Sequence, residues 1–181
     1  MFLRSKQVMT PLARRNFSVK VGDAVPSATV SVVKCDTKGD FASEIVDASE
    51  YLANKNVVVV GYPGAFTPTC MSTHLPEYIA QAQKIKDQGA DEIVCLSVND
   101  PFVVTAFAKF LDGKHLVNFI ADGNGELTKA LGLGMDLSAV QLGEVRSKRF
   151  SMIIKRGSVV EFNNEEGPSL SEKSAAATIL K

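Results

Sequence analysis

In Gly61-Tyr-Pro-Gly-Ala-Phe-Thr-Pro-Thr-Cys70 the chain passes from a run of four valines, 57–60, into a segment of helical composition, 71–88. Consecutive β-branched residues favour a strand, Pro and Gly favour a turn, and Thr67 or Thr69 can cap a helix by accepting a backbone N–H bond. Cys70 is therefore predicted in the first turn of a helix. Unpaired N–H groups and the positive end of the helix dipole lie there and stabilise a thiolate over a thiol. We interpret Cys70 as a nucleophile.

The rest of the chain alternates strand and helix patterns. The valine run shows no alternation, which indicates a strand buried on both faces. Further strands are expected at 28–33, 92–98, 116–120, 149–154 and 158–162, and helices at 47–53, 101–111, 125–131 and 171–180. Alternating strands and helices followed by a hairpin and a helix predict an α/β domain, thioredoxin-like in outline, with a central mixed β-sheet flanked by helices.

Local signals refine three of the helices. Pro76 is expected to kink the helix after Cys70, and Asn99 or Asp100 to cap the next one. Ser169 or Ser171 is expected to cap the last helix. Phe102, Phe107 and Phe110 recur at helical spacing, which predicts that all three lie in the core.

Composition excludes several classes of protein. The 181 residues are 45% hydrophobic and 22% charged, which suits one domain with a sizeable core. Basic and acidic residues balance at 20 each, and no long basic run follows the N-terminus, so no nucleic-acid partner is expected. No apolar stretch approaches the roughly 20 residues of a membrane-spanning helix. Three widely spaced cysteines without a C-x-x-C pair suit free thiols in a reducing compartment, and predict neither a disulfide framework nor a metal site.

The first 20 residues differ from the rest. They contain five basic residues and no acid, interspersed with apolar side chains, which is the composition of a transit peptide. We therefore expect residues 1–20 to direct the protein to the mitochondrial matrix, with a cytoplasmic location as the alternative, and residues 21–181 to form the domain. Removing residues 1–17 would leave 16 basic against 20 acidic residues.

Three separate motifs carry a family resemblance. Pro63-Gly-Ala-Phe-Thr-Pro-Thr-Cys70 resembles the Pro-x-x-x-Thr-x-x-Cys motif of peroxiredoxins, and 62–76, 95–100 and 148–152 resemble the peroxiredoxin-5 branch, also called type II or atypical. The resemblance implies Cys70 as peroxidatic thiolate, Thr67 as hydroxyl donor, Pro63 as a shield of the thiolate and Arg149 as its cationic partner. It also implies a homodimer that reduces hydrogen peroxide and alkyl hydroperoxides without a cofactor.

Elementary chemistry gives these roles independent sense. A free cysteine with a pKa of about 8.5 is about one-tenth thiolate near neutral pH, so complete ionisation raises its reactivity at most about tenfold. Most of the acceleration must come from stabilising a transition state in which charge moves from sulfur to the leaving oxygen. The Thr67 hydroxyl, the Arg149 guanidinium and helix N-terminal amides are suitable donors. The product at Cys70 is a sulfenic acid.

The step that reduces this sulfenic acid is left open by the sequence. The segment 163–171 contains serines and no resolving cysteine. Cys95 has the spacing of a second cysteine in plant-type members, but its strand context predicts burial; Cys35, in a predicted turn, matches the resolving cysteine of a fungal member only in rough spacing. The remaining route is an external thiol, from glutathione with glutaredoxin or from a thioredoxin-type protein.

Other chemistries fit the sequence less well. His74, four residues after Cys70, invites a Cys–His protease interpretation, but no orienting Asn or Asp is identifiable. A redox-regulated binding or chaperone module would have a slow thiol on the same fold. A thiol–disulfide oxidoreductase would need the second cysteine of a C-x-x-C pair, which is missing.

Overall fold

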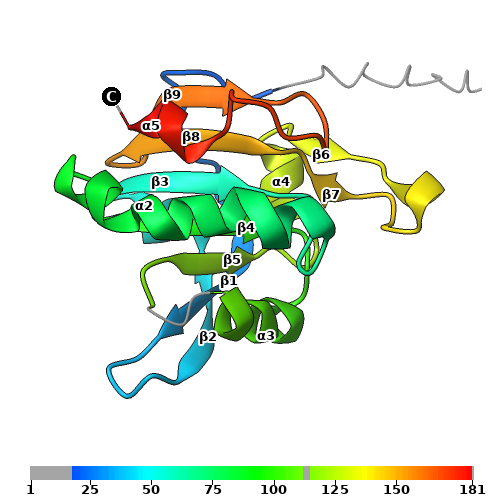
Figure 1. The fold of residues 1–181 in the computed structure, drawn as a ribbon. Helices are drawn as coiled ribbons and strands as arrows, with labels where there is room; N and C mark the ends of the chain where they lie inside the picture. Colours follow the sequence, from blue (N-terminus) through cyan, green and yellow to red (C-terminus); the bar gives the residue numbers. More distant parts are fainter. Residues whose placement is uncertain (1–17, 112–114, 181) are drawn as a thin grey trace, which may run out of the picture.

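A seven-stranded sheet runs through the middle of the molecule in the order β2-β1-β5-β4-β3-β8-β9 (Figure 1). The structure is a computed structural model that describes residues 18–111 and 115–180. The neighbouring strands β3, β4 and β5 are parallel and all other neighbours are antiparallel, so the sheet is mixed, as predicted. The strands are β1 (Thr29–Cys35), β2 (Phe41–Asp47), β3 (Asn56–Gly61), β4 (Glu92–Ser97), β5 (Asn118–Ala121), β8 (Phe150–Lys155) and β9 (Ser158–Asn164).

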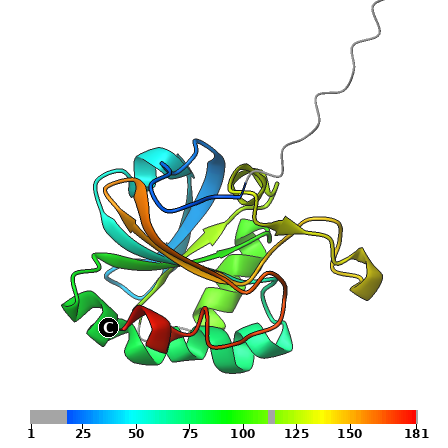
Figure 2. The same ribbon diagram turned by 90° about the horizontal axis from the view of Figure 1, so that it is seen from above.

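Helices cover both faces of the sheet (Figure 2). On one face lie α1 (Ala48–Leu52) and α4 (Glu126–Ala130), and on the other α2 (Leu75–Asp87), α3 (Pro101–Leu111) and α5 (Ala176–Ile179). The valine run of β3 alternates between the two cores, with Val57 and Val59 in the first and Val58 and Val60 in the second. This confirms a strand buried on both faces, which is why its sequence does not alternate.

An arm extends from the body beyond α4. It consists of β6 (Gly134–Met135), a short 3₁₀ helix (Ser138–Val140) and β7 (Arg146–Ser147), and it projects away from the sheet in both ribbon views (Figures 1 and 2). Most residues between the two strands are exposed. The sequence predicted no element in this region.

Several other expectations fail where tertiary contacts decide. Strand β2 was not predicted; it is an edge strand with both faces largely exposed, so it lacks a hydrophobic alternation. The last helix was expected over 171–180 but spans only Ala176–Ile179, and neither Ser169 nor Ser171 caps it. Within α3, only Phe107 of the three phenylalanines is buried, because Val104, Phe107 and Ala108 face the sheet; Phe102 and Phe110 are 84% and 63% exposed.

Gly61 lies where strand β3 passes into the segment that leads to Cys70. Gly61 ends β3 opposite Phe150 of β8, and a Cβ atom on Gly61 would lie 2.0 Å from Cε1 of the Phe150 ring. Any other residue would therefore displace this ring. The close approach of the two strands requires glycine at this position.

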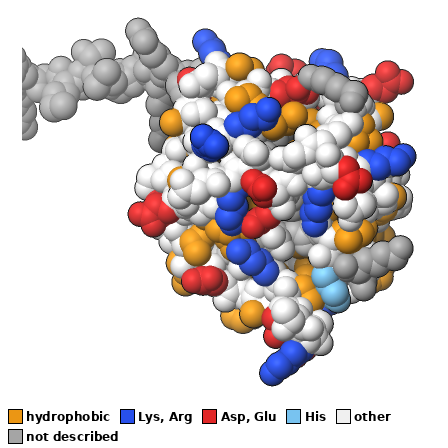
Figure 3. Space-filling model, turned by 90° about the vertical axis from the view of Figure 1, so that its left-hand side faces the viewer, with side chains coloured by type: hydrophobic (Ala, Val, Ile, Leu, Met, Phe, Trp, Pro, Cys, Tyr) orange, Lys and Arg blue, Asp and Glu red, His pale blue; other side chains and the backbone are white. Residues whose placement is uncertain are grey.

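The outer surface is mixed in charge. Figure 3 shows acidic and basic side chains interspersed over one face, with hydrophobic side chains between them. Within the described residues, no helix is both long and apolar enough to cross a bilayer. The predicted transit segment lies outside the described residues except for 18–20.

Candidate active site

Cys70 lies in the first turn of a helix, as predicted. The chain is helical from Pro68, and the N–H of Met71 donates to the carbonyl of Thr67 at 3.0 Å. Pro68 suits this position because the first N–H groups of a helix have no intrahelical acceptor. From Cys70 to His74 the turn widens to a π-helix, in which the N–H of Leu75 donates to the carbonyl of Cys70. Such wide turns are common at functional sites.

The capping expectation is wrong. The side chain of Thr69 makes no capping hydrogen bond, and the hydroxyl of Thr67 donates backwards to the carbonyl of Gly64 at 2.8 Å. The reason is the tight turn at 64–67, in which the Gly64 carbonyl also accepts from the N–H of Thr67 at 3.4 Å. The hydroxyl proton of Thr67 is therefore engaged, and its oxygen lone pairs are left to accept a hydrogen bond.

The loop before Cys70 is fixed at several points. The N–H of Tyr62 donates to the carbonyl of Leu96, and the N–H of Ala65 donates to Oδ1 of Asn99, both at 3.0 Å. Asp100 caps α3, which leaves the Asn99 side chain for this loop. Pro63, within the loop, is buried.

Phe66 forms the outer rim of the loop. It has a φ of 59°, in the left-handed region that a bulky residue rarely adopts. Its ring centroid lies 4.9 Å from that of Phe107 and 5.8 Å from that of Phe110. The aromatic contacts hold a backbone conformation that is unfavourable on its own.

Arg149 reaches Cys70 across the sheet. It directly precedes β8, whose antiparallel pairing with β3 places Phe150 opposite Gly61. Nη2 of Arg149 donates to Sγ of Cys70 at 3.4 Å, and Nε donates to the carbonyl of Pro168 at 3.0 Å. Cys70 is fully buried and Arg149 is 1% exposed. The structure thus brings together two predicted residues that are 79 positions apart in the chain.

His74 belongs to the same cluster, in a position that the sequence did not reveal. Its Nδ1 lies 2.8 Å from Nη1 of Arg149, and its Nε2 lies 3.2 Å from the carbonyl oxygen of Ser174. Burial, followed by the nearby Arg149 charge, lowers the pKa of His74 to about 4. His74 is therefore neutral at physiological pH. Its position four residues after Cys70, which suggested a protease pair, brings it into contact with Arg149 instead.

The segment after β9 closes over this cluster, and we call residues 165–175 the C-terminal strap. The strap carbonyl of Ser174 accepts from the Tyr78 hydroxyl at 2.7 Å as well as facing His74. Glu165 accepts from the N–H and the hydroxyl of Ser174, both at 2.8 Å. These bonds explain why the predicted last helix is so short: its first half is bound to α2 in a non-helical form.

The other two cysteines form no disulfide with Cys70. Cys95 is fully buried in the middle of β4, which confirms the expected burial. Cys35 ends β1 instead of lying in a turn, and is half-buried. Because β1 is antiparallel to β5, Cys35 lies toward the opposite edge of the sheet from the end of β3 that leads to Cys70. All three cysteines are free thiols.

Comparisons with known proteins show the family of this chain. The Redoxin family model matches residues 20–180. Peroxiredoxin-2D of Arabidopsis thaliana is 43% identical over 90% of this chain and 97% of its own length. The chain belongs to the peroxiredoxin family. Peroxiredoxins are thiol peroxidases, oxidoreductases that act on peroxide, and this chain is one of them.

Further relatives of this peroxiredoxin span more than one branch. The mitochondrial peroxiredoxin-2F of Arabidopsis thaliana is 41% identical over 73% of this chain and 65% of its own length. The structure of reduced Prx3 with hydrogen peroxide from Vibrio vulnificus has a TM-score of 0.77 at 39% identity, covering 90% of this chain and 97% of that one. Peroxiredoxin 5 from Alvinella pompejana has a TM-score of 0.72 at 31% identity, covering 90% and 96%.

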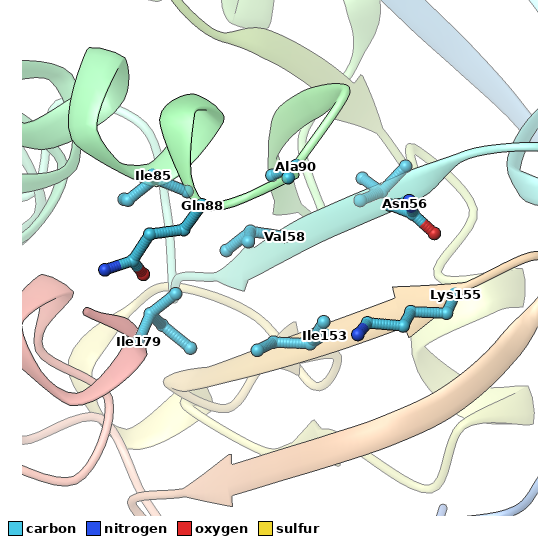
Figure 4. A pocket seen from close by; sticks show the side chains of 10 residues that line it. Asn56, Val58, Ile85, Gln88, Ala90, Ile153, Lys155 and Ile179 are labelled. Atoms are coloured by element: carbon cyan, nitrogen blue, oxygen red, sulfur yellow. The ribbon is translucent and has the colours of Figure 1, made fainter. Parts of the chain in front are cut away.

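A well-formed cleft of this peroxiredoxin lies away from Cys70. It has a volume of about 260 Å³ and lies beside the N-terminal end of β3, between the C-terminal end of α2 and α5 (Figure 4). Val58, Ile85, Ile153 and Ile179 line it, with Asn56 and Lys155 at one end. Because Cys70 follows the opposite end of β3, this cleft is not the peroxide site. Among the described residues, no cluster of three His, Cys, Asp or Glu side chains could hold a metal ion.

Proposed function

We propose that this peroxiredoxin reduces hydrogen peroxide and alkyl hydroperoxides with Cys70 as the peroxidatic residue. The observation that carries the proposal is the 3.4 Å contact between Nη2 of Arg149 and Sγ of Cys70 in a buried site. A buried guanidinium is costly unless an anion lies beside it, and a thiolate at Cys70 is that anion. The same arrangement leaves a cation at the place where negative charge develops during peroxide cleavage.

The reaction follows from this arrangement. The Cys70 thiolate attacks one peroxide oxygen, so an S–O bond forms while the O–O bond breaks. Sulfur is oxidised by two electrons, and the departing hydroxide or alkoxide takes up a proton to become water or an alcohol. Arg149 stabilises the charge as it moves from sulfur to oxygen. The Thr67 hydroxyl donates its proton to the Gly64 carbonyl, so its oxygen accepts a hydrogen bond from the peroxide O–H and orients the peroxide. Thr67 is thus an acceptor for the peroxide, whereas the family resemblance implied a donor. Pro63 keeps water from the thiolate.

Reduction of the sulfenic acid requires an external thiol in this proposal. Cys95 is buried in the sheet, Cys35 lies toward the opposite end of the sheet's strands, and neither forms a disulfide with Cys70. A thiol from glutathione with glutaredoxin, or from a thioredoxin-type protein, attacks the Cys70 sulfenic acid and releases water as a mixed disulfide forms. A second thiol then frees Cys70. Because Cys70 is buried, the wide turn at 70–74 must open before a protein thiol can reach the sulfur.

The test is peroxide consumption by the purified protein with each reductant in turn. We expect activity that is lost in Cys70→Ser and retained in Cys95→Ser and Cys35→Ser. Unchanged activity in Cys70→Ser would refute the proposal. Mass spectrometry after one equivalent of peroxide distinguishes the reductive routes, because a Cys70–Cys95 or Cys70–Cys35 disulfide would contradict the one-cysteine cycle.

We also propose a homodimer and a mitochondrial location. Phe66, Phe102 and Phe110 are exposed, and the rings of Phe66 and Phe110 contact each other beside the active-site loop, which suits an interface with a second copy. Phe110→Glu is then expected to give a monomer in analytical ultracentrifugation. The basic, acid-free residues 1–20 support a matrix location within the peroxiredoxin-5 branch, and import of the full chain but not of residues 21–181 into isolated mitochondria tests it. Failure of the full chain to enter the mitochondria would support the alternative, a cytoplasmic location.

A further inference from the structure

Arg149 is a buried cation with an unusual set of partners. Within the described residues, its guanidinium has no carboxylate partner; the only ion pair formed there joins Lys55 to Glu92. Two of its N–H groups instead donate to uncharged acceptors, the carbonyl of Pro168 and Nδ1 of His74. The third acceptor is Sγ of Cys70. Cys70 is therefore the one partner of Arg149 that can carry a negative charge.

The hydrogen bonds of His74 define its tautomer. Arginine has only donors, so Nδ1 of His74 must present a lone pair to Nη1 of Arg149 at 2.8 Å. The carbonyl of Ser174 is an acceptor, so Nε2 must carry the proton that it donates at 3.2 Å. Both ring nitrogens are thus used, and only the neutral Nε2–H tautomer satisfies both contacts. The lowered pKa of His74 agrees with this neutral form.

The carboxylate of Glu165 forms no ion pair with the guanidinium of Arg149. Glu165 influences His74 electrostatically, but its oxygens accept from Ser174 and from the hydroxyl of Ser171. It belongs to the strap, and only its backbone N–H donates to the Arg149 carbonyl, at 3.0 Å. A carboxylate in the place of His74 would hold the same guanidinium equally well, but it would neutralise the charge that faces Cys70.

We propose that His74 is a positioning residue that aims Nη2 of Arg149 at the Cys70 sulfur while leaving the guanidinium charge uncompensated, so that Cys70 alone provides the counter-charge. The inference rests on the proposed function only for the claim that this charge accelerates peroxide cleavage. The claim that it favours the thiolate stands on the geometry alone. The essential property of His74 is that it accepts the hydrogen bond from Arg149 without carrying a charge; the shape of its side chain is secondary.

A matched pair of variants separates charge from shape. His74→Asn and His74→Asp place an oxygen near the position of Nδ1, and they differ by one negative charge. Tyr78→Phe is the control for the strap, because Tyr78 donates to the same Ser174 carbonyl as His74 and makes no hydrogen bond with Arg149. The first readout is alkylation of Cys70 by iodoacetamide as a function of pH, quantified by mass spectrometry, because it reports the thiolate without peroxide. The second is the rate constant for oxidation of Cys70 by hydrogen peroxide.

We expect His74→Asn and Tyr78→Phe to alkylate within about threefold of the wild-type rate at neutral pH, and His74→Asp at least about tenfold more slowly, with recovery at higher pH. Peroxide oxidation should follow the same order. Equal profiles for His74→Asn and His74→Asp, or a loss in Tyr78→Phe as large as in His74→Asp, would overturn the inference. If the alkylation rates differ as expected while the wild type oxidises no faster than a free thiol, the peroxidase proposal fails and the positioning role stands.

A measurement on the wild-type protein covers the case in which the variants do not fold. Nitrogen chemical shifts of the His74 ring at neutral pH should show an unprotonated Nδ1 and a protonated Nε2 in the reduced protein. An imidazolium, or the tautomer with the proton on Nδ1, would refute the proposal without any substitution.

Discussion

Replacing Arg149 by Met is the most direct test of how the site works. Methionine fills a similar volume but has no charge and no donor, so the contact with Sγ of Cys70 is lost. At 3.4 Å and an effective dielectric constant of about 20, a guanidinium and a thiolate attract each other by about 5 kcal/mol. This is an upper bound on the loss, because entering water and the helix N-terminal amides recover part of the stabilisation. Removing one preorganised donor to a developing anion costs about 3–4 kcal/mol in other enzymes.

We therefore expect Arg149→Met to slow oxidation of Cys70 by about 10²–10³-fold. The chain contains no Trp, so Trp fluorescence cannot report the reaction. Competition with a haem peroxidase for hydrogen peroxide, or rapid quenching followed by mass spectrometry of the sulfenic acid, gives the rate constant. Arg156→Met is the matched control, because Arg156 is exposed in the β8–β9 turn. A loss smaller than about fivefold in Arg149→Met would refute the electrostatic argument, since it corresponds to less than about 1 kcal/mol.

Three further predictions follow from the same contacts. Thr67→Val should lower the peroxide rate constant about tenfold and Thr67→Ser should restore it, in the same competition assay, since only the oxygen lone pairs are needed; equal rates would contradict an orienting role. As pH falls from about 6.5 to about 4, an unfolded chain protonates His74 before the folded one does, so the free energy of unfolding should drop by up to about 3 kcal/mol. Urea unfolding across this range should show the drop reduced in His74→Asn, and an equal pH dependence would argue against a buried neutral ring. Gly61→Ala should destabilise the fold by about 1–3 kcal/mol or more, because its Cβ would lie 2.0 Å from the Phe150 ring; a wild-type urea midpoint would contradict this.

Local signals in the sequence predicted the elements that depend on local chemistry. The unalternating valine run indicated a strand buried on both faces, and the Pro-Gly turn placed Cys70 at a helix start; the structure confirms both. Asp100 was one of the two expected caps of α3, and its carboxylate accepts from two N–H groups of that helix, which confirms the prediction. In each case the residues that decide the conformation lie within a few positions of one another.

The failures share a different cause. The segment around 171–175 has helical neighbours and serines able to cap, yet its backbone and side chains bond to Glu165, Tyr78 and His74 instead. Propensity is a weak prior that tertiary contacts override. Likewise, the position of His74 four residues after Cys70 suggested a direct contact between the two. The bonds that define its role come from Arg149 and Ser174, which are 75 and 100 residues away.

The distance between Cys70 and Arg149 is a property of the core as much as of the loop. Arg149 directly precedes Phe150, and the loop that ends at Cys70 begins directly after Gly61, where these two residues pair at the end of adjacent strands. The Phe150 ring fills the space that a Cβ on Gly61 would need, so the packing of this pair limits how far the two strands can separate. The guanidinium of Arg149 also donates to Nδ1 of His74 and to the carbonyl of Pro168, and these two hydrogen bonds restrict its orientation. The site is rigid because the two chain segments that supply Cys70 and Arg149 start from paired positions on adjacent strands. A substitution at Gly61 should therefore lower the rate of Cys70 oxidation as well as the stability of the fold.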